Sequence, residues 1–300
     1  KKLKYEKLVS NISRLALQEE NPEVFLTKLL RILGEGTGVS RVYLFERNQK
    51  RGTMSNTFEW AAPGITPQKE ILQELPEAEF AWWVDRLKNR KVINYSDIED
   101  IPDKNAKELL KLQEIKSLLV LPVYVDENYY GFIGFDECLQ YREWEEDEVA
   151  LLIIVTEIIS LYLLQKKRED MLWFENQRFK ALVDSTEDII YELDKEQRYT
   201  GVYGKWMGKG GVRPIFFLGK TARDIFGPEK ATVHEIANKK ALEGEHVVYE
   251  WDIEVDDEVK YYQTSLSPII NRKGLISGLV GIGREITALI NIKQELQRER

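Results

Sequence analysis

The stretch over 144–183 carries a helical pattern and lies between two segments whose residues predict strands. Within it, Leu151, Val155, Ile158 and Tyr162 recur at alternating steps of four and three, which is the spacing of a coiled-coil seam. The same spacing also suits a helix that packs on its own sheet. We expect the first part of this helix to pack on its own sheet and the later part to form a dimer stalk. The chain is therefore predicted to hold two domains separated by a long helix, which a length of 300 residues allows.

Hydrophobic periodicity and turn residues place the other elements. Helices are expected over 3–18, from Pro22 to the glycines at 34–38, and over 287–300. Neighbouring strands are joined by short turns in both halves, so the sheets are expected to be antiparallel. The predicted strands lie at 40–47, 53–61, 91–98, 117–125 and 128–138 in the first half, and at 188–194, 198–205, 246–255, 259–270 and 275–286 in the second.

The predicted fold class is α+β, with two antiparallel-sheet domains joined and flanked by long helices. The expected organisation is a linker helix over 1–20, a first domain over 21–165 whose closing helix begins near 144, a linker helix over 166–183, a second domain over 184–288, and the start of a C-terminal helix over 289–300.

Composition excludes several classes of protein. A formal net charge of -8 argues against nucleic acid as a partner, because phosphate contacts need a basic surface. The single cysteine, Cys138, excludes internal disulfides and multi-cysteine zinc sites. The longest apolar run contains Glu157 and is too short for a membrane span, and no signal peptide is visible. We therefore expect a cytoplasmic chain, and its charged helical ends suggest a fragment of a longer protein.

The run "SGLVGIGREIT", over 277–287, has the closely spaced glycines of a phosphate-binding loop. Such a loop leaves a strand and opens a helix, so that free N–H groups face the phosphate. Here the glycines lie inside a predicted strand, with Gly281 and Gly283 on one face and Val280 and Ile282 on the other. We expect the glycine face to border a cavity and the other face to pack against a helix.

The segment "GLVGIGREIT", preceded by "YYQTSLSPIINRKG", resembles the closing strands of a PAS sensor domain. The segment "FKALVDSTEDIIYELDKEQRY" resembles the beginning of such a domain, so that the resemblance covers 176–288. The family's terminal Asp-Ile-Thr stands here as Glu285, Ile286 and Thr287, with a longer acid at the first position. The resemblance implies that these three residues pass a change in the sheet to the helix that follows.

The first half resembles a GAF domain over 20–165, because "SLLVLPVYVDENYYGFIGFDE" followed by "REWEEDEVALL" matches that family's last hairpin and closing helix. GAF–PAS tandems joined by helices are typical of prokaryotic sensor kinases. The resemblance implies a sensory input module, and the seam in 144–183 predicts a homodimer through the linker helices. The resemblance also implies a histidine kinase domain downstream and a response regulator as its partner. No catalytic site is visible in this segment itself.

The motif "VHEIAN" around His234 resembles two catalytic motifs and completes neither. Asn238 stands where a zinc-binding helix needs its second histidine, and Lys239 stands where the phosphoacceptor box of a histidine kinase has proline. The PAS resemblance leaves a third interpretation, in which His234 ligates haem iron. The alternative is an exposed or capping histidine.

Cys138 ends the last strand of the GAF-like domain and allows three interpretations: a packing residue, a redox sensor, or an attachment point for haem. No histidine lies beside it as in a bilin-binding pair, so we expect no bilin site. The second half has no cysteine, which argues against a flavin photoreceptor. No Asn-Lys pair lies just upstream of "FIGFDE", which disfavours a cyclic nucleotide. The cofactor therefore stays unknown, with haem as an open alternative.

Aromatic residues are the remaining candidates for the walls of ligand pockets, although they could equally fill the cores. The candidates are Trp60, Trp82, Trp83 and Tyr95 with Cys138 in the first domain, and Tyr191, Tyr203, Trp206, Phe226, His234, Trp251 and Gly283 in the second. We expect a sensory module that responds to a small ligand or a partner and moves helices. The alternatives are a relay scaffold with filled pockets and a haem-based redox or gas sensor.

Overall fold

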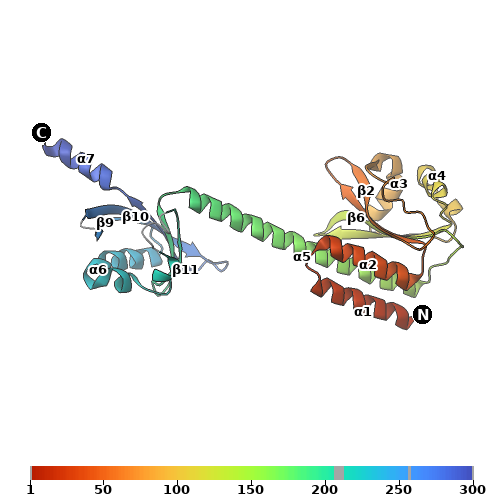
Figure 1. The fold of residues 1–300 in the computed structure, drawn as a ribbon, viewed down its shortest axis with the longest axis horizontal. Helices are drawn as coiled ribbons and strands as arrows, with labels where there is room; N and C mark the ends of the chain where they lie inside the picture. Colours follow the sequence, from red (N-terminus) through yellow and green to blue (C-terminus); the bar gives the residue numbers. More distant parts are fainter. Residues whose placement is uncertain (1, 206–212, 256–257, 299–300) are drawn as a thin grey trace. The chain divides into compact units, whose positions relative to one another are not determined.

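The chain forms two compact units that divide between Met171 and Leu172. A computed structural model describes residues 2–205, 213–255 and 258–298. Each unit is built on one antiparallel sheet with helices packed on it, so the predicted α+β fold class is confirmed (Figure 1). None of the helices in these described ranges is long and apolar enough to cross a membrane.

The first unit holds a six-stranded sheet in the order β3-β2-β1-β6-β5-β4. Its strands are β1 (Arg41–Asn48), β2 (Thr53–Ala61), β3 (Leu75–Pro76), β4 (Ile93–Tyr95), β5 (Ser117–Val125) and β6 (Asn128–Glu137). One face is covered by α1 (Lys2–Gln18), α2 (Pro22–Thr37) and the first part of α5 (Glu146–Ser185), and the other by α3 (Ala81–Lys88) and α4 (Lys104–Leu112) (Figure 1).

The second unit holds a five-stranded sheet in the order β8-β7-β11-β10-β9. Its strands are β7 (Ile189–Asp194), β8 (Tyr199–Tyr203), β9 (Val247–Val255), β10 (Glu258–Ile270) and β11 (Ile276–Glu285). Helix α6 (Ala222–Leu242) packs on this sheet, and α7 (Thr287–Arg298) follows β11. Helix α6 is kinked at Gly227 (φ 80°), directly before Pro228.

Local sequence signals explain where α2 begins and ends. The side chain of Asn21 accepts hydrogen bonds from the backbone N–H groups of Glu23 (2.9 Å) and Val24 (3.3 Å), and Pro22 occupies the first turn, where no N–H partner is needed. At the other end Gly38 adopts a left-handed conformation (φ 70°), which suits a residue without a Cβ.

The predicted seam of α5 lies in the core of the first unit. Val155 and Tyr162 are only 1% and 4% exposed, and Leu151 and Ile158 are half-buried against the same core. The ring of Tyr162 stacks on Phe25 of α2, with centroids 3.9 Å apart. These four residues therefore pack inside the first unit. A dimer contact along α5 has to use other side chains.

The glycines of β11 make room for neighbouring strands. A Cβ on Gly281 would collide with the ring of Tyr191, and one on Gly278 would collide with the carbonyl of Leu193. The face that carries Gly281 and Gly283 is buried in the core of the second unit. The expectation for the opposite face differs from the structure, because Ile282 is 42% exposed and so lacks the helix cover that was predicted.

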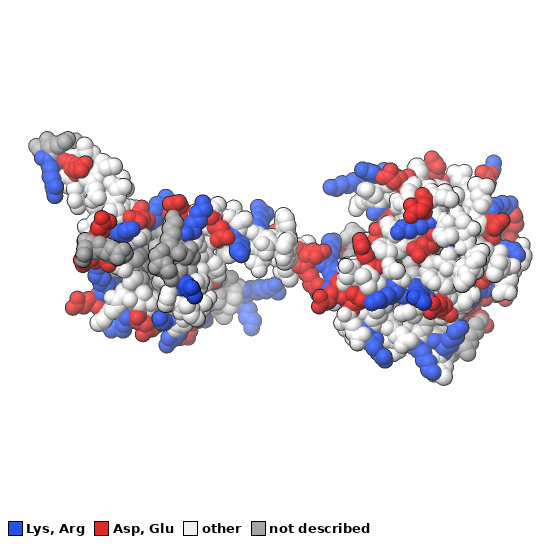
Figure 2. Space-filling view, in the orientation of Figure 1, with Lys and Arg blue, Asp and Glu red and all other residues white. Residues whose placement is uncertain are grey.

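Charged side chains of both signs are interspersed on the face of the molecule drawn in Figure 2. That face has no large basic area that could follow a phosphate backbone.

Val155→Asp should destabilise the first unit by about 3–5 kcal/mol, because it places a carboxylate in the core. Ile154→Asp, at the neighbouring exposed position, should have little effect. Hydrogen–deuterium exchange of β1 and β5 in increasing urea measures the stability of this unit alone. Equal stability of the two variants would contradict the assignment of the seam to the core.

Candidate functional site

A small apolar cavity lies between the sheet of the first unit and helices α3 and α4. Its volume is about 50 Å³. The lining residues are mostly aromatic or aliphatic: Tyr43, Phe45, Met54, Leu72, Leu75, Phe80, Trp83, Ala106, Leu109, Leu110, Gln113 and Phe132. The ring of Phe132 stacks on Phe45 with centroids 4.7 Å apart and meets Trp83 edge-on at 6.1 Å. Pockets for drug-sized ligands have about 300–1,000 Å³, so side chains fill most of this space.

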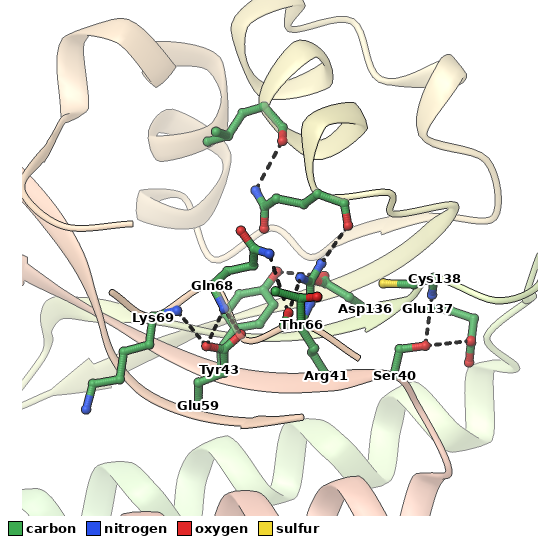
Figure 3. A network of polar contacts seen from close by, with 12 residues as sticks. Ser40, Arg41, Tyr43, Glu59, Thr66, Gln68, Lys69, Asp136, Glu137 and Cys138 are labelled. Atoms are coloured by element: carbon green, nitrogen blue, oxygen red, sulfur yellow. Dashed lines mark hydrogen bonds and ion pairs between the residues drawn. The ribbon is translucent and has the colours of Figure 1, made fainter. Parts of the chain in front are cut away.

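A buried ion pair lies beside this cavity (Figure 3). Arg41 of β1 and Asp136 of β6 stand directly opposite each other in the sheet, their side chains are each 1% exposed, and Arg41 Nη2 lies 3.3 Å from Asp136 Oδ2. Tyr43, which lines the cavity, donates its hydroxyl hydrogen to Asp136 Oδ1 (2.9 Å). Arg41 also donates to the carbonyls of Thr66 and Gln113, at 3.3 Å each. The ion pair therefore connects the cavity wall to two loops.

The charge state of this network follows from its burial. Desolvation raises the pKa of Asp136 to about 6, against the opposing effects of Arg41 and the Tyr43 hydroxyl. Burial and the adjacent Asp136 also raise the pKa of Tyr43 well above its usual value, so its hydroxyl stays protonated. A buried arginine keeps its charge, and Asp136 therefore carries the compensating charge above pH 6.

Two further sets of hydrogen bonds hold the loops around the ion pair (Figure 3). The carboxylate of Glu59 accepts from the backbone N–H groups of Gln68 (2.8 Å) and Lys69 (2.6 Å), which fixes the loop that contains Thr66. Ser40 donates to Glu137 and accepts from the backbone N–H of Cys138, both at 2.9 Å.

The structure separates the aromatic residues predicted for the first pocket. Trp83 lines the cavity. Trp82 and Tyr95 face each other, with ring centroids 6.4 Å apart, and neither lines it. Trp60 packs on the opposite face of the sheet, against α2, because a bulge in the β1–β2 pairing between Leu44 and Phe45 shifts the register.

Cys138 is half-buried and lies outside the cavity lining, and burial raises the pKa of its thiol. A raised pKa disfavours the nucleophilic thiolate. Sequence reasoning missed Tyr43, Phe45 and the Arg41–Asp136 pair, although the alternation of residues along β1 was a usable signal.

The second unit gathers several predicted residues around His234 of α6. Its imidazole stacks on Phe226 (centroids 4.9 Å apart) and meets Trp251 edge-on at 4.7 Å. Its Nδ1 lies 2.7 Å from the hydroxyl oxygen of Tyr249. Burial lowers the pKa of His234 to about 4, so the ring is neutral at pH 7. These contacts occupy Nδ1 and one face of the His234 imidazole. Haem ligation through Nε2 of the same ring stays a prediction.

The other residues predicted for the second pocket are dispersed. Tyr191 lies in the core beside Tyr199, with centroids 5.2 Å apart, and Tyr203 meets Phe179 of α5 at 5.7 Å. Gly283 lies next to the hydroxyl of Thr264. Trp206 lies outside the described residues. Among those that are described, no group of three or more histidine, cysteine or acidic side chains could hold a metal ion.

The predicted signal-transfer residues join β11 to α7. Ile286 donates its backbone N–H to the carbonyl of Tyr261 (2.8 Å), and the hydroxyl of Thr287 accepts from the backbone N–H of Tyr261 (3.0 Å). The carboxylate of Glu285 accepts from Thr287 (3.1 Å) and lies 3.7 Å from Lys260 Nζ. The basic neighbour of Glu285 is therefore a lysine of β10.

Comparison with known proteins identifies both units. Residues 21–163 match the GAF domain family, and residues 183–291 match a PAS fold family. The chain is a GAF domain followed by a PAS domain. Both are sensory domains without catalysis of their own, so the chain is a sensory module of signal transduction.

One curated protein similar to this chain is a histidine kinase. The chain is 29% identical over 149 residues to the methanogenesis regulatory histidine kinase FilI of Methanothrix harundinacea (strain 6Ac). The match covers 48% of this chain and 17% of the relative. The chain thus spans less than one fifth of that kinase.

Two solved structures with the GAF fold correct one expectation. One is the phycocyanobilin-bound GAF domain of a cyanobacterial phytochrome (TM-score 0.50, 18% identity, covering 55% of this chain and 96% of that chain). The other is the phycoerythrobilin-bound GAF domain of a cyanobacterial phytochrome (TM-score 0.50, 16% identity, 56% and 98%). Because this fold holds bilins in those proteins, the missing Cys-His pair alone does not exclude a bilin here, and the cofactor stays unknown.

Arg41→Met should destabilise the GAF domain by about 3–5 kcal/mol at pH 7, because Asp136 is left as an uncompensated buried charge. The pKa of Asp136 is higher in the folded state (about 6) than in an unfolded chain, so protonation stabilises the fold. The loss of stability caused by Arg41→Met should therefore become smaller as the pH falls through 6. Hydrogen–deuterium exchange of β1 and β6 in urea measures it.

The matched control is Arg31→Met, which breaks the exposed Arg31–Glu35 pair (2.8 Å) and should have little effect. If the two arginine variants were equally stable at pH 7, the buried pair would not have the structural role described here.

The stability of the PAS domain should fall by about 2 kcal/mol between pH 7 and pH 5, because His234 has a lower pKa folded (about 4) than unfolded. This stability is complete above the unfolded pKa and is lost as the pH falls toward 4. His234→Gln should remove most of the dependence, whereas His246→Gln, at an exposed position, should leave it. Hydrogen–deuterium exchange of β9 and β10 in urea at pH 7 and pH 5 measures the stability of the PAS domain. If His234→Gln kept the same change of stability with pH as the wild type, His234 would not be its cause.

Proposed function

We propose that this chain is the input region of a sensor histidine kinase, in which GAF and PAS domains control a kinase domain through helices α5 and α7. The downstream kinase and its response regulator are proposed from the match to a histidine kinase. The observation that carries the proposal is an ion pair between the two ends of the PAS domain.

Asp188 lies between the end of α5 and the start of β7, and Arg284 lies near the end of β11, before α7. Arg284 Nε donates to Asp188 Oδ1 (3.0 Å) and Nη2 donates to Oδ2 (2.9 Å), which is a bidentate geometry. The hydrogen bonds from Arg284 lower the pKa of Asp188, so its carboxylate stays charged at neutral pH. The pair supports a relay in which a displacement at the end of α5 reaches the start of α7.

Exposed apolar side chains on the two helices support dimer formation between copies of the chain. On α7, Leu289, Ile292 and Leu296 are exposed at steps of three and four. On α5 the exposed set is Ile153, Ile154, Leu161, Met171, Leu172, Trp173, Phe174, Phe179 and Leu182. Apolar surface of this extent on helices favours burial against another helix, and a second copy supplies the same residues.

The cavity of the GAF domain limits the ligand that it could sense. An apolar cavity of about 150 Å³ is known to bind benzene, and this one has about 50 Å³. A larger ligand therefore requires Phe45, Trp83 or Phe132 to move. The same observation favours the second candidate function, a relay scaffold whose GAF pocket is filled by its own side chains. Native mass spectrometry of the purified protein distinguishes these functions, and an absorption spectrum would reveal a bound haem or bilin.

With a histidine kinase module attached after Arg300, Asp188→Arg and Arg284→Asp should each change basal autophosphorylation about fivefold or more, because each breaks the link between the helices. The double exchange should restore the original level, since the pair re-forms with its charges swapped. Phosphate incorporation from labelled ATP measures the output.

Arg223→Ala is the control, because it removes the exposed Arg223–Glu235 pair (2.7 Å) of the PAS domain without touching its ends. Unchanged output in both single variants, with native hydrogen exchange in β7 and β11, would contradict the relay.

A further inference from the structure

The lining of the GAF cavity is mostly apolar. Most of its residues have hydrocarbon or thioether side chains, and the exceptions are Tyr43, Trp83 and Gln113. Two of these three donate to other groups of the protein. Tyr43 donates to Asp136 (2.9 Å), and the side-chain amide of Gln113 donates to the carbonyl of Leu109 (3.2 Å). A buried water needs two to four polar partners, so this cavity favours an apolar occupant.

Aromatic walls define the shape of the cavity. The rings of Phe45 and Phe132 stack with centroids 4.7 Å apart. Tyr43 meets Phe45 edge-on at 5.7 Å, and Trp83 meets Phe132 in the same way at 6.1 Å. Because each ring rests on another, the rings cannot all turn to close the space between them. An apolar molecule of matching size would gain van der Waals contacts with all of these walls.

Helix α4 contributes the smallest side chain of the lining. Ala106 is 3% exposed and lines the cavity. Its backbone N–H donates to Oδ1 of Asp103 (3.0 Å), the N-cap residue of α4, and this bond fixes the first turn of the helix. A longer side chain at position 106 would therefore occupy part of the cavity. The size of this residue determines how much room a ligand has.

We propose that this cavity binds one uncharged, apolar molecule of roughly two to four heavy atoms between the GAF sheet and α4. The size follows from the volume of about 50 Å³, because one water occupies about 10–15 Å³ of such space. None of the described lining residues carries a charge, so an ionised ligand would lose its hydration without compensation. The binding stands on the cavity alone, and only its effect on kinase output rests on the proposed function.

Xenon is a suitable probe, because Met54 lines the cavity and its methyl group can be observed by NMR. In the intact chain with ¹³C-labelled methionine methyl groups, xenon should shift the Met54 resonance, which is assigned from its loss in Met54→Leu. The resonance of Met171, which is 57% exposed, should hardly move. Ethane should also shift Met54. Methanol has the same number of heavy atoms and should bind about tenfold more weakly, because its hydroxyl would lose hydrogen bonds to water.

Ala106→Leu should weaken xenon binding about tenfold or more, because the added side chain occupies the cavity. The matched control is Ala81→Leu, the same replacement at an exposed position of α3, which should keep the wild-type affinity. Leu110→Ala should enlarge the cavity and admit benzene, which the wild type should not bind. Native hydrogen exchange in β1 and β6 establishes that each variant is folded.

Three results would overturn the proposal: no shift of Met54 at the highest xenon pressure, equal xenon affinity in Ala106→Leu and Ala81→Leu, or methanol binding as tightly as ethane. A nuclear Overhauser effect between the Met54 methyl group and water would identify water as the occupant and would also count against an apolar ligand. Xenon binding without a change in kinase output would leave the site standing and count only against the sensing role.

Discussion

The packing of α5 on the GAF sheet is the contact on which most of this structure depends. Leu152, Val155 and Ile159 are buried in one core with α1, α2 and the sheet, and burial of three such side chains stabilises the fold by roughly 5 kcal/mol. The same helix continues to Ser185, four residues before β7 begins. One helix therefore closes the GAF domain and leads into the PAS domain.

Elements with strong local signals could be predicted from the sequence. Which elements pack against each other could not. The hairpin β5–β6, the capped start of α2 and the fold class all agree with periodicity and turn chemistry. The edge strand β4 is shorter than predicted, with three residues from Ile93 to Tyr95. Val155 and Tyr162 show the limit most clearly, because steps of three and four do not say whether the partner is a sheet or another helix.

The candidate site was harder to predict, because it depends on strand register and on which face each side chain takes. Arg41 and Asp136 stand at the ends of their strands in the sequence, where charge usually meets solvent, and only the β1–β6 pairing places them opposite each other in the interior. The bulge in β1–β2 likewise sends Trp60 to the helix-covered face, while Trp83 reaches the cavity from α3. The aromatic content of the sequence indicated that aromatic side chains line a cavity. The strand register determines which of these side chains reach it.

The exposure of Arg284 gives the PAS domain a dependence on ionic strength. Its side chain is 71% exposed while that of Asp188 is 17% exposed, so dissolved ions reach the pair from the arginine side. At physiological salt, charges in water are screened over about 8 Å, and at 1 M over about 3 Å. The ion pair between the two ends of the domain is thus weaker at high ionic strength than at low ionic strength, and in the proposed relay the salt concentration would change the coupling without any ligand.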